Sequence, residues 1–250
     1  MAAVIEFLGF LVDVLLESGI FFVTLLQGRT RFGARAFRTQ IRLMALQPLP
    51  VVSIFAISLG LILSSQAVHF LEVLNLESQM IEMIVLALVR HFAPIVVGIF
   101  VAGRSGLALA VQLGAMVMRR EIDALTLMDI EPLRFVVGPT FCVSLISMVV
   151  LSLWFAALSV LAAGGFLEYW RQIPISMFIG VIGNVLSWSD LLVCLAKGLV
   201  IGVLVMVVSA FNGLTIDNHA NSLSRIATYT VVQSLLIVIL VQLAFSLEWS

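Results

Sequence analysis

Long apolar runs separated by short polar stretches dominate the hydropathy pattern of the chain. About 20 consecutive apolar residues are enough for a helix to cross a bilayer. Helices can span lipid because they satisfy their backbone hydrogen bonds internally. The pattern therefore predicts an all-α integral membrane protein, folded as a single domain over residues 1–250. Its five predicted transmembrane helices lie at about 43–70, 84–116, 135–163, 191–211 and 226–247.

The first apolar stretch, residues 3–27, has a different pattern. Glu6, Asp13, Glu17 and Thr24 recur at helical spacing and fall within about 20° of one line along a helix. Three carboxylates on one stripe make a full span costly, so we predict an interfacial helix that lies in the membrane plane. A sixth span is the alternative, because interfacial helices usually carry Lys or Arg on their polar face.

A basic segment follows at residues 29–42. Its arginines recur at helical spacing and form one face, made of Arg31, Arg35, Arg38 and Arg42. Such a face can rest on anionic headgroups, at about 1 kcal/mol per residue, or it can be a solvated linker. In either case the positive-inside rule places it in the cytoplasm. Five spans then leave the C-terminus on the opposite side of the membrane.

A short polar stretch at residues 119–132 separates the second and third spans. Acidic residues in its first turn suit the helix dipole, apolar residues lie along one side, and Pro132 limits its extent. The pattern is typical of a cytoplasmic helix that docks in a groove of a soluble partner, or of a plain surface helix folded against the membrane. The docking residues would be Glu121, Ile122, Asp123, Leu125, Met128 and Glu131.

Two polar residues, Arg90 and His91, interrupt the second span near its outer third. Charges at membrane depth are costly and usually functional. The pair is either packed between helices with its polar groups satisfied, or it binds an anionic lipid headgroup, because a guanidinium can hold a phosphate through two hydrogen bonds.

Two further cations lie inside apolar runs. Arg104 is flanked by Gly103 and Gly106, which would permit close helix approach. We expect it to have a structural role, neutralising a buried acid or carbonyl ends. Lys197, the single lysine of the chain, could extend toward the headgroups or contribute to a site.

Composition agrees with the membrane class and narrows the chemistry. Hydrophobic residues make up 62% and charged residues 11% of the chain, with a mean hydropathy of +1.20, whereas about a quarter of a soluble protein is charged. Lys197 is followed by Gly198, so the chain has no phosphate-binding loop of its own. It also lacks H-E-x-x-H and G-x-S-x-G sequences and a cysteine cluster. We therefore expect no catalytic residue, metal or bound cofactor in this chain.

Two stretches resemble a known family. AGRSGLALAVQLGAMVMRREIDALTLMDIEPLRFVVGP (102–139) is similar to the signature of the MlaE/YrbE permeases, the membrane subunits of ABC transporters that work with MCE-domain proteins. FNGLTIDNHANSLSRIATYTVVQS (211–234) resembles the closing segment of that family. Together with the span pattern, the resemblance covers nearly the whole chain.

The resemblance implies an N-terminal interfacial helix plus five spans, assembled as a homodimer in the bacterial inner membrane. The N-terminus would be cytoplasmic and the C-terminus periplasmic. It also implies two copies of an ATPase subunit that uses ATP and Mg, a periplasmic MCE-domain protein, and phospholipid movement between inner and outer membranes. Residues 119–132 match the family's coupling helix, which docks in the ATPase, and Arg90 matches an arginine near the lipid cavity.

The chain departs from the family pattern at several positions. His91 stands where Glu is usual, Ala93 where Gly is usual, and Asp129 where Gly is frequent. These changes leave the cargo open, so a related hydrophobic cargo is an alternative to phospholipid. Two other classes also remain, a membrane-embedded lipid-modifying enzyme using Arg90 and His91, and a non-transporting membrane scaffold.

Overall fold

The computed structural model describes residues 9–10, 12–14, 16–17, 19, 40–74, 77–129, 136–171, 178, 180, 182–183, 185–215 and 222–248. Throughout these parts the regular structure is helical, without strands. Five helical stretches are long and apolar enough to cross a membrane, which confirms the predicted fold class and the number of spans. They are Met44–Val68, Ile81–Met118, Gly138–Trp170, Trp188–Leu214 and Leu223–Leu247.

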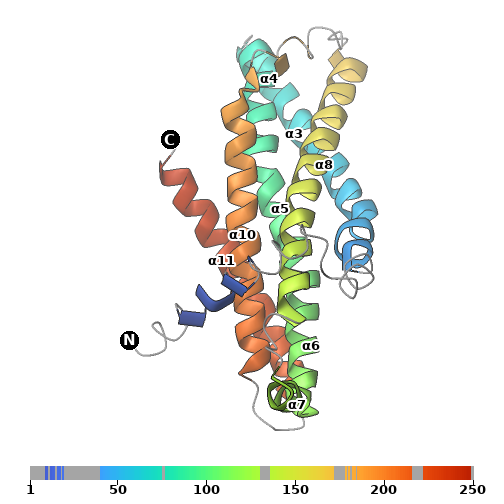
Figure 1. The fold of residues 1–250 in the computed structure, drawn as a ribbon. Helices are drawn as coiled ribbons and strands as arrows, with labels where there is room; N and C mark the ends of the chain where they lie inside the picture. The colour runs from blue at the N-terminus through green and yellow to red at the C-terminus, as the bar shows by residue number, and fades with distance from the viewer. Residues whose placement is uncertain are drawn as a thin grey trace.

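The first and third spans are single long helices that pack along each other (Figure 1). The first begins with a π-helical turn, η1 (Arg42–Leu46), and continues as α3 (Leu49–Leu74). The third is α8 (Gly138–Arg171). A Cβ atom at Gly60 of α3 would lie 2.3 Å from the Ser159 carbonyl oxygen of α8, so the close approach of the two backbones depends on this glycine.

The second span is a column of five short helical pieces. They follow one another as α4 (Glu77–Leu86), η2 (Ala87–Phe92), α5 (Ala93–Val101), η3 (Ala102–Gly106) and α6 (Leu107–Met118). The pieces η2 and η3 are π-helical turns, a local widening of the helix that is often found at functional sites. Arg90 lies in η2 and Arg104 in η3.

The remaining described elements are α7 (Glu121–Leu127), α10 (Trp188–Leu214) and α11 (Ser222–Glu248). The helices α8, α10 and α11 all pack against the second span, and α11 also packs against α10 (Figure 1). The core between them contains fully buried apolar residues such as Val97, Phe155 and Ile201. This packing fixes the second span, and therefore Arg90, relative to α10 and α11.

Several helices run past the apolar stretches that predicted them. The helix α3 continues to Leu74 and α8 to Arg171, beyond the predicted ends at 70 and 163. The reason is physical: hydropathy marks the segment that fits in lipid, whereas backbone hydrogen bonding continues into the interface.

A second, smaller core lies near the α7 end of the molecule. There Val14 of the N-terminal stretch is buried among Leu109, Phe141 and Met206. The Phe10 and Phe211 rings meet edge to face, with centroids 5.5 Å apart. The described residues between 9 and 19 are helical. The rest of the predicted interfacial helix, 3–27, lies outside the described residues, and its placement in the membrane plane stays a prediction.

Candidate functional site

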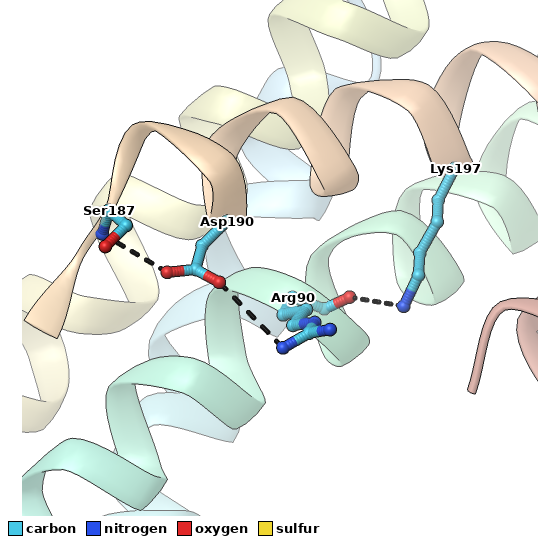
Figure 2. A network of polar contacts seen from close by, with 4 residues as sticks. All are labelled: Arg90, Ser187, Asp190 and Lys197. Atoms are coloured by element: carbon cyan, nitrogen blue, oxygen red, sulfur yellow. Dashed lines mark hydrogen bonds and ion pairs between the residues drawn. The ribbon is translucent and has the colours of Figure 1, made fainter. Parts of the chain in front are cut away.

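Polar side chains from three helices meet beside the second span. The turn η2 supplies Arg90 and His91, α10 supplies Asp190 and Lys197, and α11 supplies Gln242. Figure 2 shows Arg90 with Asp190 on one side and Lys197 on the other. We call these five residues the Arg90 cluster. Three members of the cluster, Arg90, His91 and Lys197, were candidates from the sequence. The structure adds Asp190 and Gln242, which the sequence analysis did not name.

The shape of η2 follows from Pro94. A proline has no N–H to donate, and in a regular α-helix its ring would clash with the carbonyl four residues earlier, which is that of Arg90. The widened turn avoids this clash, and the Ala93 N–H donates to the Leu88 carbonyl, five residues back. The Arg90 carbonyl therefore lacks the α-helical donor that any other residue at position 94 would supply.

Lys197 replaces that donor. Its Nζ atom donates a hydrogen bond to the Arg90 carbonyl oxygen over 3.1 Å (Figure 2). The side chain is 1% exposed, and the ammonium lies 6.0 Å from the centroid of the Phe245 ring, a cation–π distance. The Lys197 side chain is therefore directed into the helix bundle, against the second span.

Asp190 is held by its own helix and by Arg90. Its Oδ2 atom accepts a hydrogen bond from the Ser187 N–H at 3.2 Å, as part of a capping box that starts α10. Its Oδ1 atom lies 3.9 Å from Arg90 Nη1, and the two side chains are 14% and 20% exposed. At this distance the contact is an ion pair and not a close two-point hydrogen bond.

His91 contacts the fifth helix of the bundle. Its Nδ1 atom lies 3.0 Å from Gln242 Nε2, so an imidazole and an amide form a hydrogen-bonded pair between η2 and α11. The Gln242 Oε1 atom is buried and has no hydrogen-bond partner in the described part of the chain. The His91 ring therefore contacts the neighbouring helix α11 through one of its two nitrogens.

Sequence reasoning missed Asp190 and Gln242 for different reasons. Asp190 carries a usable signal, because S-x-x-D before an apolar run is a helix N-terminus pattern that starts α10 at Trp188. Gln242 has no such signal. It is one polar residue in an apolar helix, and only the packing of α11 against η2 brings it to His91.

Arg104 differs from the expectation. Its side chain is exposed, and its guanidinium donates to the Gln47 side-chain oxygen, just before α3. It therefore does not neutralise a buried acid within the described parts of this chain. The two flanking glycines differ in their surroundings. A Cβ atom at Gly106 would lie 2.6 Å from Ser209 Oγ, whereas a Cβ atom at Gly103 would have no neighbour within 4 Å. The predicted close helix approach is correct for Gly106 alone.

The short helix between the second and third spans is α7, and it is smaller than the predicted 119–132. Arg120 and Asp129, both with left-handed backbone (φ 56° and 59°), flank it, and Leu127 is its last residue. The left-handed backbone of Asp129, a conformation that favours glycine, follows directly after the end of the helix. Glu131 and Pro132 lie outside the described residues.

No residue of α7 is buried. Its most exposed apolar side chains are Leu127 (88%) and Met128 (69%), at its C-terminal end. Ile122 and Leu125 are half-buried. Leu127 was absent from the predicted docking residues, although it is exposed together with Met128. Glu121 forms an exposed ion pair with Arg119, at 3.7 Å.

The predicted basic face is largely untested. Arg42, at the start of η1, is exposed. Arg31, Arg35 and Arg38 lie outside the described residues.

The comparison with known families gives a match that covers most of the chain. The family profile described as Permease MlaE matches residues 37–247. The chain belongs to the MlaE permease family. The match includes both motifs that suggested the resemblance, all five spans, α7 and the Arg90 cluster.

Individual relatives agree with the family. An "Intermembrane phospholipid transport system permease protein MlaE" of Haemophilus influenzae is 29% identical over 201 residues, which is 80% of this chain and 77% of the relative. A probable ABC transporter permease protein of Rickettsia typhi is 25% identical over 203 residues, 80% of this chain and 78% of the relative. One of Synechocystis is 26% identical over 241 residues, 96% and 89% respectively.

Proposed function

We propose that the chain is the permease subunit of an ABC transporter that moves phospholipid or a related lipid between the inner and outer membranes of a bacterium. The observation that carries the proposal is the family match over 37–247, combined with the phospholipid transport named for the Haemophilus influenzae relative. The five apolar helices suit a multi-pass subunit in the inner membrane.

In this proposal a separate ATPase subunit binds ATP and Mg and supplies the energy. Two copies of the permease form a homodimer, and a periplasmic MCE-domain protein receives or delivers the lipid. The α7 end of the molecule faces the cytoplasm, so the N-terminus is cytoplasmic and the C-terminus periplasmic. The positive-inside rule supports this orientation through the basic segment 29–42.

The surface of α7 supports its role as the ATPase docking site. Exposed Leu127 and Met128 can enter an apolar groove, and Glu121 and Asp123 in the first turn add charge around it. Only the two-residue turn Arg119–Arg120 separates α7 from α6. A displacement of α7 by the ATPase would therefore move the second span directly.

The second span also carries Arg90 and His91, which we assign to contact with the lipid headgroup. Coupling of ATP hydrolysis to transport requires that the lipid bind differently in the two states of the cavity. Because η2 is held by α10 and α11 through the Arg90 cluster, a movement of the second span changes the position of these side chains relative to the two neighbouring helices.

The docking proposal predicts that Leu127→Asp abolishes retention of the ATPase subunit while the permease remains in the membrane. The charge would replace the most exposed apolar side chain of the proposed docking surface, and loss of such an apolar contact weakens an interface strongly. The measurement is a pull-down of the tagged chain in mild detergent, with mass spectrometry of the retained proteins.

Leu247→Asp is the matched control. Leu247 is 81% exposed, similar to Leu127, but lies at the far end of α11. This variant should keep the ATPase. Retention of the ATPase by Leu127→Asp at the level of the control would contradict docking through α7. Retained ATPase without lipid movement in reconstituted vesicles would instead favour the scaffold.

A further inference from the structure

Three consecutive residues near the C-terminal end of α10 contact three other parts of the molecule. The Phe211 ring lies edge to face on Phe10 of the N-terminal stretch, with ring centroids 5.5 Å apart. The Asn212 side chain is hydrogen-bonded to α11, and Gly213 lies against α6. This end of α10 lies at the same end of the molecule as α7 (Figure 1). We call Phe211, Asn212 and Gly213 the α10 junction.

Gly213 brings α10 into direct contact with the backbone of α6. A Cβ atom at this position would lie 2.8 Å from the Ala110 carbonyl oxygen and 2.8 Å from Leu113 Cβ. Ala110 and Leu113 are fully buried. One further contact of this kind joins the same two spans, where Gly106 lies against Ser209. Closely packed interiors transmit displacement, so we expect α6 and α10 to move together.

Asn212 joins α11 to this pair of helices. Its Nδ2 atom donates hydrogen bonds to Gln233 Oε1 at 2.7 Å and to Thr230 Oγ1 at 3.3 Å. The Thr230 side chain is fully buried, and Asn212 and Gln233 are half-buried. Because Thr230 and Gln233 are three residues apart, they lie on one face of α11. A single amide therefore holds two neighbouring points of that face.

The packing of α11 makes these hydrogen bonds important. In the single chain, 22% of its most apolar stretch is buried, compared with 56% for α10 and 50% for the second span. Its Leu236, Leu240 and Leu243 side chains are more than half exposed. Helices in lipid gain little from the hydrophobic effect and associate through close packing and interhelical hydrogen bonds. Asn212 therefore provides a larger share of the attachment of α11 than it would in a well-buried helix.

We propose that Asn212 is a positioning residue of the transport cycle, which makes α11 follow α6 and α10 when the ATPase displaces α7. The inference rests on the proposed transport function. The contacts are continuous, because α7 joins α6 through the turn Arg119–Arg120, α6 packs on Gly213, and Asn212 holds α11. Packed side chains and hydrogen bonds of this kind carry coupling between distant sites. Since α11 also carries Gln242, which contacts His91, its movement changes the Arg90 cluster.

The test measures how much lipid is moved for each ATP hydrolysed. The full chain, with its ATPase and MCE-domain partners, is reconstituted in vesicles of equal parts phosphatidylethanolamine and phosphatidylglycerol with a trace of fluorescent phosphatidylethanolamine. Exchange of the fluorescent lipid with acceptor vesicles and release of phosphate are recorded together. Asn212→Leu keeps the side-chain size and removes both hydrogen bonds. It should retain the ATPase and hydrolyse ATP, but move about fivefold less lipid per ATP, a factor equivalent to the net free energy of one hydrogen bond.

Three further variants identify the cause. Gln40→Leu is the matched control, because Gln40 Nε2 donates to Thr140 Oγ1 of α8 at 3.1 Å, so its loss removes an interhelical amide bond without touching α11. It should keep the unmodified ratio of lipid to ATP. Gln233→Leu removes an acceptor of Asn212 from the other helix and should lower the ratio as Asn212→Leu does. The exchange Asn212→Gln/Gln233→Asn keeps an amide pair of the same total length and should restore most of the ratio.

Size-exclusion chromatography and retention of the ATPase show whether each variant is folded, and the two single variants on different helices serve if one is not. A folded Asn212→Leu or Gln233→Leu variant with the unmodified ratio would overturn the inference, even at a lower free energy of unfolding, because the bonds would then only stabilise the fold. An equal loss in Gln40→Leu, or no recovery in the exchange variant, would also overturn it. An unmodified complex that hydrolyses ATP and moves no lipid would instead contradict the proposed transport function itself.

Discussion

The two arginines of the second span occupy the same kind of local structure and have opposite surroundings. Arg90 and Arg104 both lie in π-helical turns. Around Arg90, side chains from α10 and α11 supply an acid, an ammonium and an amide. Arg104 instead donates a hydrogen bond to the side-chain amide oxygen of Gln47 at the surface. The widening of a helix therefore does not define a site, and the neighbouring helices decide what each turn presents.

The largest effect should come from Lys197→Met. The Arg90 carbonyl would lose the hydrogen bond from Lys197, and loss of the donor to an acceptor that is shielded from water costs about 1–3 kcal/mol. We expect a loss of that size in the free energy of unfolding, measured by thermal or denaturant unfolding in detergent. A change near zero in the free energy of unfolding would mean that the Lys197 hydrogen bond does not stabilise the protein.

A second substitution identifies the cause. Pro94→Ala restores a backbone N–H at the position from which an α-helix donates to Arg90. The double variant Pro94→Ala/Lys197→Met should therefore be more stable than the sum of the single effects predicts. Strict additivity would show that Lys197 stabilises the protein through something other than the carbonyl freed by Pro94.

The next effect, about 1–2 kcal/mol, should come from Arg90→Met. The Asp190 carboxylate would lose its cation while keeping the Ser187 N–H and the N-terminus of α10, so the cost is below that of a fully buried broken pair. Unfolding in detergent measures this loss. Asp190→Asn added to Arg90→Met should recover most of it, because the unpaired charge is removed. Without such recovery, the ion pair would not be the source of the loss.

Part of this arrangement could be predicted from the chain alone. The five spans and the position of α7 follow from hydropathy, and the cost of charge in lipid singles out Arg90 and Lys197 as candidates. The residues that contact these cations cannot be predicted from the sequence pattern. Gln242 lies 151 positions from His91, and no periodicity relates a residue of α11 to one of η2. The end of α7 at Leu127 was also missed, since no sequence pattern indicated the left-handed backbone of Asp129 that follows it.

Arg104 also shows that the sequence does not reveal the surroundings of a charged side chain. A charged residue between two glycines in an apolar run suggested a buried structural role, yet the side chain is exposed. Hydropathy cannot distinguish a position that faces a neighbouring helix from one that faces outward. Only Gly106 of the two glycines faces α10 closely enough to require the absence of a side chain.

The smallest effect should therefore come from Arg104→Met, below about 0.5 kcal/mol in the free energy of unfolding, because exposed polar contacts contribute little. Gln47→Leu, which removes the other half of the contact, should fall in the same range, and both are measured beside Lys197→Met under identical detergent conditions. A loss for Arg104→Met as large as that for Lys197→Met would mean that the guanidinium is held by more than Gln47. The difference in surroundings between the two π-helical turns would then disappear, and both arginines would be held by several neighbouring side chains.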